Sequence, residues 1–418
     1  MQVRLHGGAV TEMHAARSFL TAAATAALAL AAPARDFQKE IDAAASAGGG
    51  RVTVPAGTWD VAKLHLRSNV ELHLEEGSVL RFSENPDDYL PKVETSWQGE
   101  EMMNWSPLVY AAFATNVSIT GKGMLKTGHA SWNSWFRKHG GNRRPQFIQF
   151  FRCRNVLIEG VSVRGTPFWT IHLYRTDDAV VKGVDVSAFD GEGRAIMNSD
   201  GIDIECSRRV RVVGCSFRQG DDAIVLKSGR DEDGIRRGIP TEDVLVEDCR
   251  VQEGHTLLGI GSEVGGGVRN VTMRNCTVDG AVNQLLFVKT NAKRGGYIEN
   301  VAMENIRADG VRQAVLGLMA DYWYYPPPGA TNLHRTPIRN VAARHIDIGE
   351  AGSVAMLRGD PELPARDFTL EDVKIGRVRA KMVEAANVEN LRIDGLEVRI
   401  PPVVPLKKDD PSRGGQEK

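Results

Sequence analysis

The 418-residue sequence has little of what several classes of protein require. It carries 52 Lys and Arg against 53 Asp and Glu, a formal charge of −1, so it has no basic excess to neutralise phosphates and we expect no nucleic-acid partner. The longest apolar stretch, residues 18–32, is shorter than the ~20 residues that cross a bilayer, and we expect no membrane partner. No two cysteines have the C-x-x-C spacing of a zinc site, and we expect buried thiols rather than disulfides. The five cysteines are Cys153, Cys206, Cys215, Cys249 and Cys276.

The two ends of the chain differ in composition from the rest. Arg17 precedes the apolar run 18–32, and Ala32-Pro33-Ala34 follows it as an A-x-A cleavage site. This arrangement predicts a signal peptide over residues 1–34 and a periplasmic or secreted protein, although an Ala-rich helix is the alternative. Residues 401–418 are rich in Pro, Lys and Asp and predict a loose tail.

Stretches with helical periodicity are also scarce, and short alternating runs repeat instead. One helix is predicted over 36–47, with Asp36 as its N-cap and Phe37 and Ile41 on one face. From residue 69 to 391 an Asn, or sometimes Asp or Arg, precedes a β-branched run, and successive starts at 156, 180, 210, 244, 271 and 301 lie 24 to 34 residues apart. A repeat of this length with β-alternation indicates a solenoid. We predict an all-β, single-domain right-handed parallel β-helix over 36–400, capped by the N-terminal helix.

In such a solenoid, equivalent residues stack in ladders about one strand spacing apart. Cys215, Cys249 and Cys276 are expected to form one inward ladder, and the Asn residues another at a turn. Two stretches, about 83–108 and 320–338, interrupt the repeat. Because insertions in solenoids tend to gather on the binding face, both are expected near a functional site.

The densest polar cluster lies in the central coils. Asp200, Asp221, His255 and Lys289 are separated by 21, 34 and 34 residues, each close to one coil, so we expect them to stack on one outer face. Asp222 can join them only at a turn or bulge, which the preceding Gly220 favours. Carboxylates crowded in one cleft raise at least one pKa, so one can donate a proton while the others activate water. Inverting glycoside hydrolysis requires this combination, whereas each Asp alone could be a simple turn residue.

The same residues carry a resemblance to a known family. Asn198-Ser199-Asp200, Gly220-Asp221-Asp222, Gly254-His255 and Lys289 resemble the N-T-D, G/Q-D-D, G-H-G and R-I-K motifs of glycoside hydrolase family 28, the polygalacturonases, and stretches 227–234 and 260–267 resemble its bacterial exo-acting branch. The resemblance, from about 36 to 372, implies a β-helix that hydrolyses galacturonic-acid-containing pectic chains without a cofactor.

It also implies roles for individual residues. Asp221 would be the general acid, Asp200 and Asp222 would hold and deprotonate water, and His255 would tune the acid and contact substrate. Lys289 would bind the uronate carboxylate, and Asn198 is part of the same motif.

Three positions depart from the family pattern. Ser199 and Thr256 replace Thr and Gly, and Phe287 replaces the Arg of R-I-K, which removes half of the carboxylate clamp. Arg230, Lys293 or Arg294 could supply the missing cation from a nearby loop, although such residues are more often solvated surface charges. Phe287 could instead form an apolar wall for a methyl group, or point inward as a core residue.

Two further ring side chains lie together in the sequence stretch 166–172. Trp169 could stack on a sugar or be a packed aromatic, and His172 could be a structural histidine. The reaction class also stays open. A pectate lyase on the same solenoid would need a Ca²⁺-binding carboxylate set, and a non-catalytic carbohydrate-binding β-helix would bind sugar without turnover. We expect no metal, and the sequence does not predict the oligomeric state.

Overall fold

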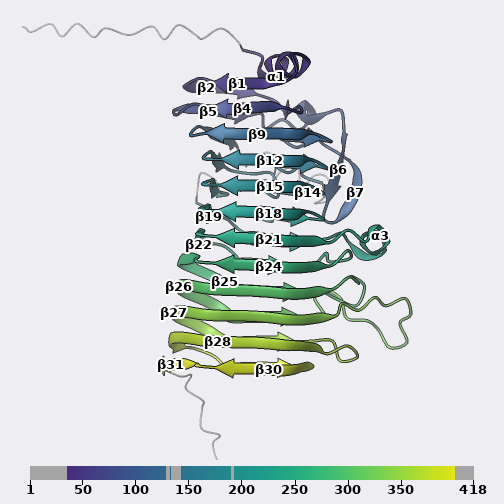
Figure 1. The fold of residues 1–418 in the computed structure, drawn as a ribbon, viewed down its shortest axis with the longest axis vertical. Coiled ribbons are helices and arrows are strands. Elements are labelled where there is room, and N and C mark those ends of the chain that lie inside the picture. Colours follow the sequence, from purple (N-terminus) through teal and green to yellow (C-terminus); the bar gives the residue numbers. More distant parts are fainter. Residues whose placement is uncertain (1–34, 129–131, 133–142, 190–192, 401–418) are drawn as a thin grey trace, which may run out of the picture. The chain divides into compact units, whose positions relative to one another are not determined.

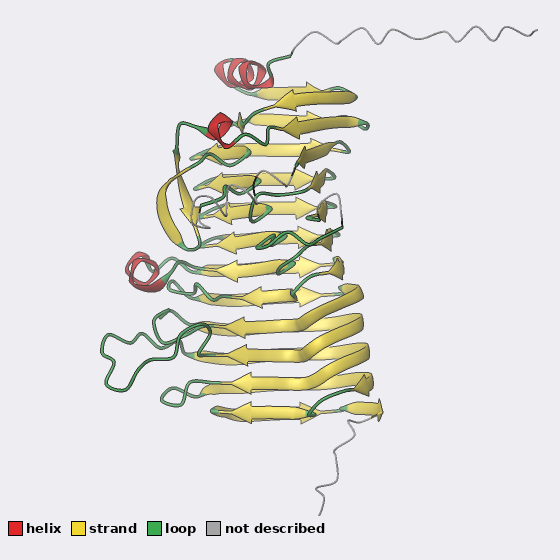
Figure 2. Ribbon diagram, turned by 180° about the vertical axis from the view of Figure 1, so that it is seen from behind, coloured by secondary structure: helices red, strands yellow, loops and turns green. Residues whose placement is uncertain are grey.

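Short parallel strands wind through three rows, each coil stacked on the one before (Figures 1 and 2). The strands enclose an apolar core. The computed structural model describes residues 35–128, 132, 143–189 and 193–400, so the predicted signal peptide and tail lie outside the described residues. Within the described part of the chain, residues 37–400 form one compact unit, which contains all the described strands. No described helix is long and apolar enough to cross a bilayer.

The strands fall into three rows according to their pairing, and each pairs in parallel with its neighbours one coil away. The first row contains β1 (Gly50–Val54), β4 (Val70–Leu74), β9 (Thr115–Gly121), β12 (Arg154–Glu159), β15 (Asp177–Lys182), β18 (Arg208–Val213), β21 (Thr241–Glu247), β24 (Val268–Arg274) and β30 (Val388–Asp394). The second contains β2 (Gly57–Val61), β5 (Ser78–Phe82), β10 (Met124–Thr127), β13 (Ser162–Arg164), β16 (Asp185–Ser187), β19 (Ser216–Arg218), β22 (Arg250–Glu253) and β31 (Glu397–Ile400).

The third row carries the polar cluster. It contains β3 (Leu64–His65), β8 (Val109–Ala112), β11 (Ile148–Phe151), β14 (Ile171–Tyr174), β17 (Ile202–Glu205), β20 (Ile224–Lys227), β23 (Thr256–Ile260) and β29 (Val383–Ala386). Four long strands bend from one row into another: β25 (Thr277–Lys289), β26 (Ile298–Met319), β27 (Ile338–Arg358) and β28 (Ala365–Val378). The architecture confirms the predicted right-handed parallel β-helix.

Two ladders confirm the predicted stacking. Asn300 donates to Asn270 at 3.1 Å and accepts from Asn340 at 2.8 Å, and each of the three has a φ near +56°. The left-handed turn explains the Asn preference, because Asn tolerates this conformation better than β-branched residues do. Inside the coils, Cys249 lies within hydrogen-bonding reach of Cys215 and Cys276. All five cysteines are buried, and none of them forms a disulfide.

The N-terminal helix and the two insertions also lie where the sequence predicts. Helix α1 (Phe37–Ser46) buries Phe37 and Ile41 against the first coils. The first insertion forms a one-turn helix, η1 (Pro86–Tyr89), and an antiparallel hairpin of β6 (Val93–Trp97) and β7 (Glu100–Asn104). The second is a loop between β26 and β27. A short helix that the sequence pattern did not predict, α3 (Asp231–Arg237), follows β20 on the same side (Figures 1 and 2).

Candidate active site

The three aspartates lie in turns that lead into strands of the third row. Asp200 comes directly before β17, and Asp221 and Asp222 form a bend before β20. This bend lets neighbouring residues line one cleft, as predicted, because a regular strand would send them to opposite faces. Gly220 permits it, since a Cβ there would lie 2.3 Å from the Ile196 carbonyl oxygen.

The stacking differs in detail from the predicted single column. Ile202 pairs with Ile224, so Asp222 rather than Asp221 lies above Asp200 on the next coil. Asp221 aligns with His255, whose backbone N–H donates to the Asp221 carbonyl at 2.8 Å. The sequence spacing missed this one-residue offset because the coils differ in length.

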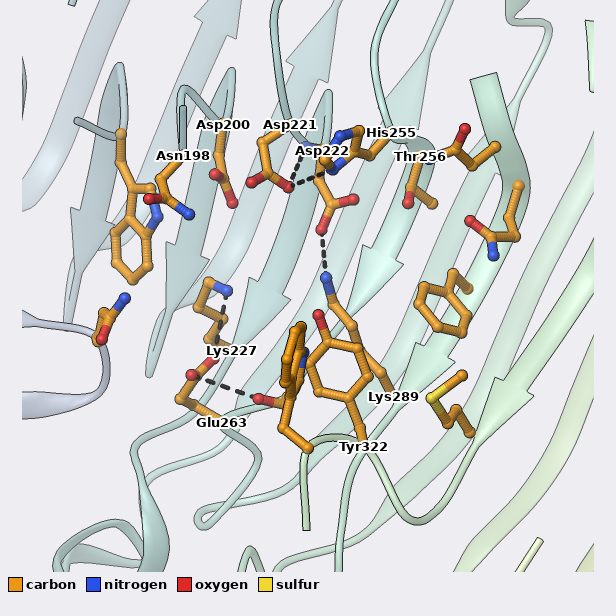
Figure 3. A pocket seen from close by; sticks show the side chains of 18 of the residues that line it. Asn198, Asp200, Asp221, Asp222, Lys227, His255, Thr256, Glu263, Lys289 and Tyr322 are labelled. Atoms are coloured by element: carbon orange, nitrogen blue, oxygen red, sulfur yellow. Dashed lines mark hydrogen bonds and ion pairs between the residues drawn. The ribbon is translucent and has the colours of Figure 1, made fainter. Parts of the chain in front are cut away.

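Lys289 is also displaced from the predicted column. Leu226 pairs with Ile260 and Ile260 with Val288, so Lys289 lies in the same column as Lys227. Its side chain therefore approaches the aspartates from the opposite end of the strand row (Figure 3). The cluster is nevertheless brought together as predicted.

The three carboxylates form one compact group. Each offers an oxygen within 4.8 Å of the others. Asp221 accepts a hydrogen bond from the Asp222 backbone N–H at 3.0 Å and lies 3.1 Å from His255 Nδ1, while Lys289 Nζ donates to Asp222 Oδ2 at 2.6 Å (Figure 3). Asp200 and Asp222 are 4% and 1% exposed, so their charges are almost removed from water.

The surroundings separate the proton affinities of these carboxyls. Burial, and next the charge of Asp221, raise the pKa of Asp200 well above its usual value. Burial acts in the same direction on Asp221, but the hydrogen bond from His255 and the charge of Lys289 leave the pKa of Asp221 below its usual value. The hydrogen bond to Asp221 in turn raises the pKa of His255. Of these two carboxyls, Asp200 is therefore the one that holds a proton more tightly.

A second buried cation, Lys227, faces the same cleft and was not among the predicted site residues. Its Nζ lies 3.3 Å from both Glu263 Oε2 and the Gly261 carbonyl oxygen, and 3.8 Å from Asp203 Oδ1. Lys227 lies one coil before Gly261 and two coils before Lys289 in the same column. This alignment follows from the strand register, which the sequence spacing does not give.

The cleft has a volume of about 680 Å³ and is bordered by both insertions. The β6–β7 hairpin covers the outer face of the earlier third-row strands: Ser96 Oγ donates to Glu205 at 3.1 Å, and Gln146 and Gln149 donate to the Ser96 carbonyl. Gln98, in the hairpin turn, lines the cleft where this cover ends. Tyr322 and Trp323 of the second insertion also line it, and Tyr322 lies opposite the aspartates (Figure 3).

The remaining predicted residues divide between the cleft and its support. Asn198 lines the cleft, and its side-chain oxygen accepts from Arg144 at 3.0 Å. Thr256 is buried in the lining at the start of β23. Trp169 also borders the cleft but is only 3% exposed, stacks on Phe168 and lies under Lys227 Nζ, 4.9 Å from its ring centroid. This packing favours the alternative of a packed aromatic, because no ring face is open for a sugar.

The residues proposed to replace the missing arginine behave differently from one another. Arg230 lines the cleft, 3.8 Å from Glu100 and 3.7 Å from Asp231. Arg294 lines it too, bound to Asp231 and to Ser262 Oγ at 3.3 Å. Lys293 lies over the Tyr324 ring and is not part of the lining.

Phe287 shares its face of β25 with Lys289, lines the cleft and lies outside the apolar core cluster, which favours the cleft position, although its side chain is only 9% exposed. Its ring is 6.2 Å from that of Tyr322, edge to face. His172, in contrast, is fully buried between Gln149 and Glu205 at 2.9 and 3.0 Å, which confirms the structural histidine.

Comparison with known proteins agrees with this geometry. The family model "Glycosyl hydrolases family 28" matches residues 49–395. The chain belongs to glycoside hydrolase family 28. It is therefore a glycoside hydrolase, as the motif resemblance predicts.

Individual relatives come from plants, fungi and bacteria. A probable polygalacturonase of Vitis vinifera is 24% identical over 82% of this chain and 70% of its own length. An exo-poly-alpha-D-galacturonosidase of Dickeya chrysanthemi is 23% identical over 57% of this chain and 46% of its own length. The structure of a hyperthermoactive exopolygalacturonase from Thermotoga maritima is 32% identical with a TM-score of 0.75, covering 86% of this chain and 87% of that one.

Proposed function

We propose that this family 28 hydrolase removes galacturonic acid from the end of α-linked pectic chains. The observation that carries the proposal is the group of three carboxylates within 4.8 Å, two of them held by His255 and Lys289, in a cleft that the β6–β7 hairpin borders on one side. The similarity to the Thermotoga maritima exopolygalacturonase supports the same substrate class and end-directed cleavage.

The proposed roles follow from the contacts of each group. Lys289 and Lys227 give the cleft the positive charge that a uronate requires, as charge-assisted hydrogen-bond donors. Asp222, held by Lys289, and Asp200, one coil away, flank the position for a water. Asp221 donates the proton to the leaving oxygen, with His255 at its side.

This assignment requires the proton to reach Asp221 once substrate is bound. Lys289 is one of the charges that lower the pKa of Asp221 in the empty cleft. A uronate carboxylate beside Lys289 offsets that charge and so raises the proton affinity of Asp221, the carboxyl that then lies next to the leaving oxygen. Because the carboxyl groups lie so close, the proton is shared by the cluster and moves with small changes in charge.

Substitution of the aspartates tests these roles. Asp221→Asn, Asp200→Asn and Asp222→Asn are each expected to lower kcat on oligogalacturonides by at least ~100-fold, since a positioned acid or base contributes about 10²–10⁴-fold. Asp178→Asn, on the surface, is the matched control, and far-ultraviolet circular dichroism verifies folding. Near-normal turnover by Asp221→Asn would contradict its role as the acid.

A lyase reaction is the second candidate, because the spacing of the three carboxylates could also hold a cation. A calcium-dependent lyase would release products with a double bond that absorb in the ultraviolet. We expect hydrolysis without such absorbance, and activity that survives EDTA, because His255 and Lys289 already neutralise the cluster. Calcium-dependent ultraviolet-absorbing products would favour the lyase.

We also propose export of the protein, on the basis of the Arg17–Ala34 composition. N-terminal sequencing of protein recovered from outside the cytoplasm should begin close to residue 35. An intact N-terminus in a cytoplasmic fraction would contradict export.

A further inference from the structure

Beyond the aspartates, the cleft continues into a second groove of about 520 Å³ over β25, β26, β27 and β29. The two share Gln284, Phe287, Gln313 and Met319 in their linings. The β6–β7 hairpin covers the third row on the other side of the aspartates. A sugar chain whose terminal unit lies against the hairpin therefore extends away from it, past Phe287 and into the second groove.

The floor of this groove is apolar and built around the Phe287 ring. Phe287 pairs with Gly317 and Gly317 with Met356, so the three residues form one outward column on successive coils. A Cβ on Gly317 would lie 2.9 Å from Phe287 Cδ2, and the absence of a side chain there leaves space for the ring. Met356 is 41% exposed and extends the same apolar surface.

The polar side chains around this floor are either uncharged or already paired with a side chain of opposite charge. Gln284 donates to Gln313 at 2.5 Å, and this amide pair is suited to sugar hydroxyls. Of the cations that line the groove, Arg358 lies 2.8 Å from Asp321 and Lys381 lies 2.5 Å from Glu384. Among the described lining residues, each cation thus has an acidic partner, so a second uronate would compete with an existing carboxylate.

We propose that this groove is a subsite for an uncharged sugar unit that bears a methyl group, next to the galacturonate held at the aspartates. The methyl group lies on the Phe287 ring, at the family position for a carboxylate-binding arginine. A methyl-esterified galacturonate and a 6-deoxy sugar share this chemistry. The inference rests on the proposed function and makes that function specific for decorated chains.

The test compares three trisaccharides that differ only in the unit next to the terminal galacturonate: a free uronate, its methyl ester, or a 6-deoxy sugar. Wild-type enzyme is expected to have a kcat/KM at least about tenfold higher on one or both methyl-bearing substrates, the usual effect of a fitted methyl group. The better of the two identifies the source of the methyl group. Faster cleavage of the free uronate would overturn the inference.

Substitution at the ring provides the second arm. Phe287→Arg is expected to shift the ratio about 10- to 100-fold toward the free uronate, because it adds a charge-assisted hydrogen bond. Phe113→Arg, on a ring that is 58% exposed and outside the cleft lining, is the matched control and should leave the ratio unchanged. Phe287→Leu, which keeps the site apolar, is expected to slow only the methyl-bearing substrates several-fold.

If Phe287→Arg does not fold, Phe287→Leu decides the question, and an unchanged ratio in a folded variant refutes the subsite. A wild-type enzyme inactive on all three substrates would contradict the proposed function. An active wild-type enzyme whose ratio ignores Phe287 would contradict the subsite alone.

Discussion

Removal of the Lys227 ammonium group is expected to destabilise the fold strongly at neutral pH. Lys227 and Glu263 are 3.3 Å apart, with side chains only 7% and 12% exposed. Burial alone raises the pKa of Glu263, but the charge of Lys227, and next that of Arg294, lower it from 4.5 to about 2. Each tenfold change in proton affinity corresponds to about 1.4 kcal/mol, so the charged environment of Glu263 contributes about 3 kcal/mol at pH 7.

The direction of the pKa change gives this contribution a definite pH dependence. Because the folded state lowers the pKa of Glu263, the stabilisation is complete above the unfolded value of 4.5 and is lost as the pH falls toward about 2. Lys227→Met is therefore expected to cost about 2–4 kcal/mol at pH 7, and about 1 kcal/mol less at pH 3.5. Urea denaturation followed by circular dichroism measures both values as midpoint differences at unchanged slope.

A double-mutant cycle separates this pair from its neighbours. Glu263→Gln alone leaves Lys227 with Asp203, and the double variant removes both charges, so we expect a coupling free energy of about 2 kcal/mol or more. The exposed pair Lys182–Glu159, at 2.9 Å and 58% and 42% exposed, is the matched control, with a coupling below about 1 kcal/mol. Equal coupling in the two pairs, or a loss independent of pH, would refute the reasoning.

Three further predictions concern the hairpin, the Asn ladder and the thiols. Glu101→Gln should raise KM several-fold with little change in kcat, because Glu101 binds Arg152 at 2.8 Å and Tyr174 at 2.7 Å and so fastens the hairpin; a change in kcat alone would contradict this role. Asn300→Ala should lower the free energy of unfolding, measured by urea denaturation, by about 1–2 kcal/mol, because it removes two hydrogen bonds of the Asn ladder at a residue with a φ of +56°. A loss below about 0.3 kcal/mol would contradict this role of the ladder. The five buried cysteines should react with a thiol reagent only after denaturation, which absorbance titration measures, and reaction in the native state would show that the coils open.

The fold could be predicted because local chemistry repeats on every coil. Asn300 and its equivalents mark the left-handed turn, and Cys249 and its neighbours mark an inward position, so the ladders were visible as spacings. The offset of Lys289 could not be predicted from spacing, because the number of residues per coil varies and only the backbone pairing fixes which side chains align. Lys227 was missed for the same reason.

The character of individual side chains was harder to predict than their presence. The alternation of side chains along the strand did not tell whether Phe287 points into the core or toward the cleft. In the structure its ring lies beside Gly317 and lines the cleft. As an indole ring near the site motifs, Trp169 could have stacked on a sugar, but the Lys227 ammonium group covers one face of the ring. The proton affinities of Asp200 and Asp221 depend on burial and on His255, which the sequence does not provide.

Proton NMR of trigalacturonate during hydrolysis tests most directly whether the three aspartates carry out end-directed, inverting cleavage. We expect the first product to be monomeric galacturonic acid in the β configuration, opposite to the α linkage, before mutarotation mixes the anomers. This outcome is informative because retention would require one of the carboxylates to attack the sugar itself, whereas inversion requires it to activate a water. Initial release of the α anomer, or of longer oligomers in place of the monomer, would contradict the account.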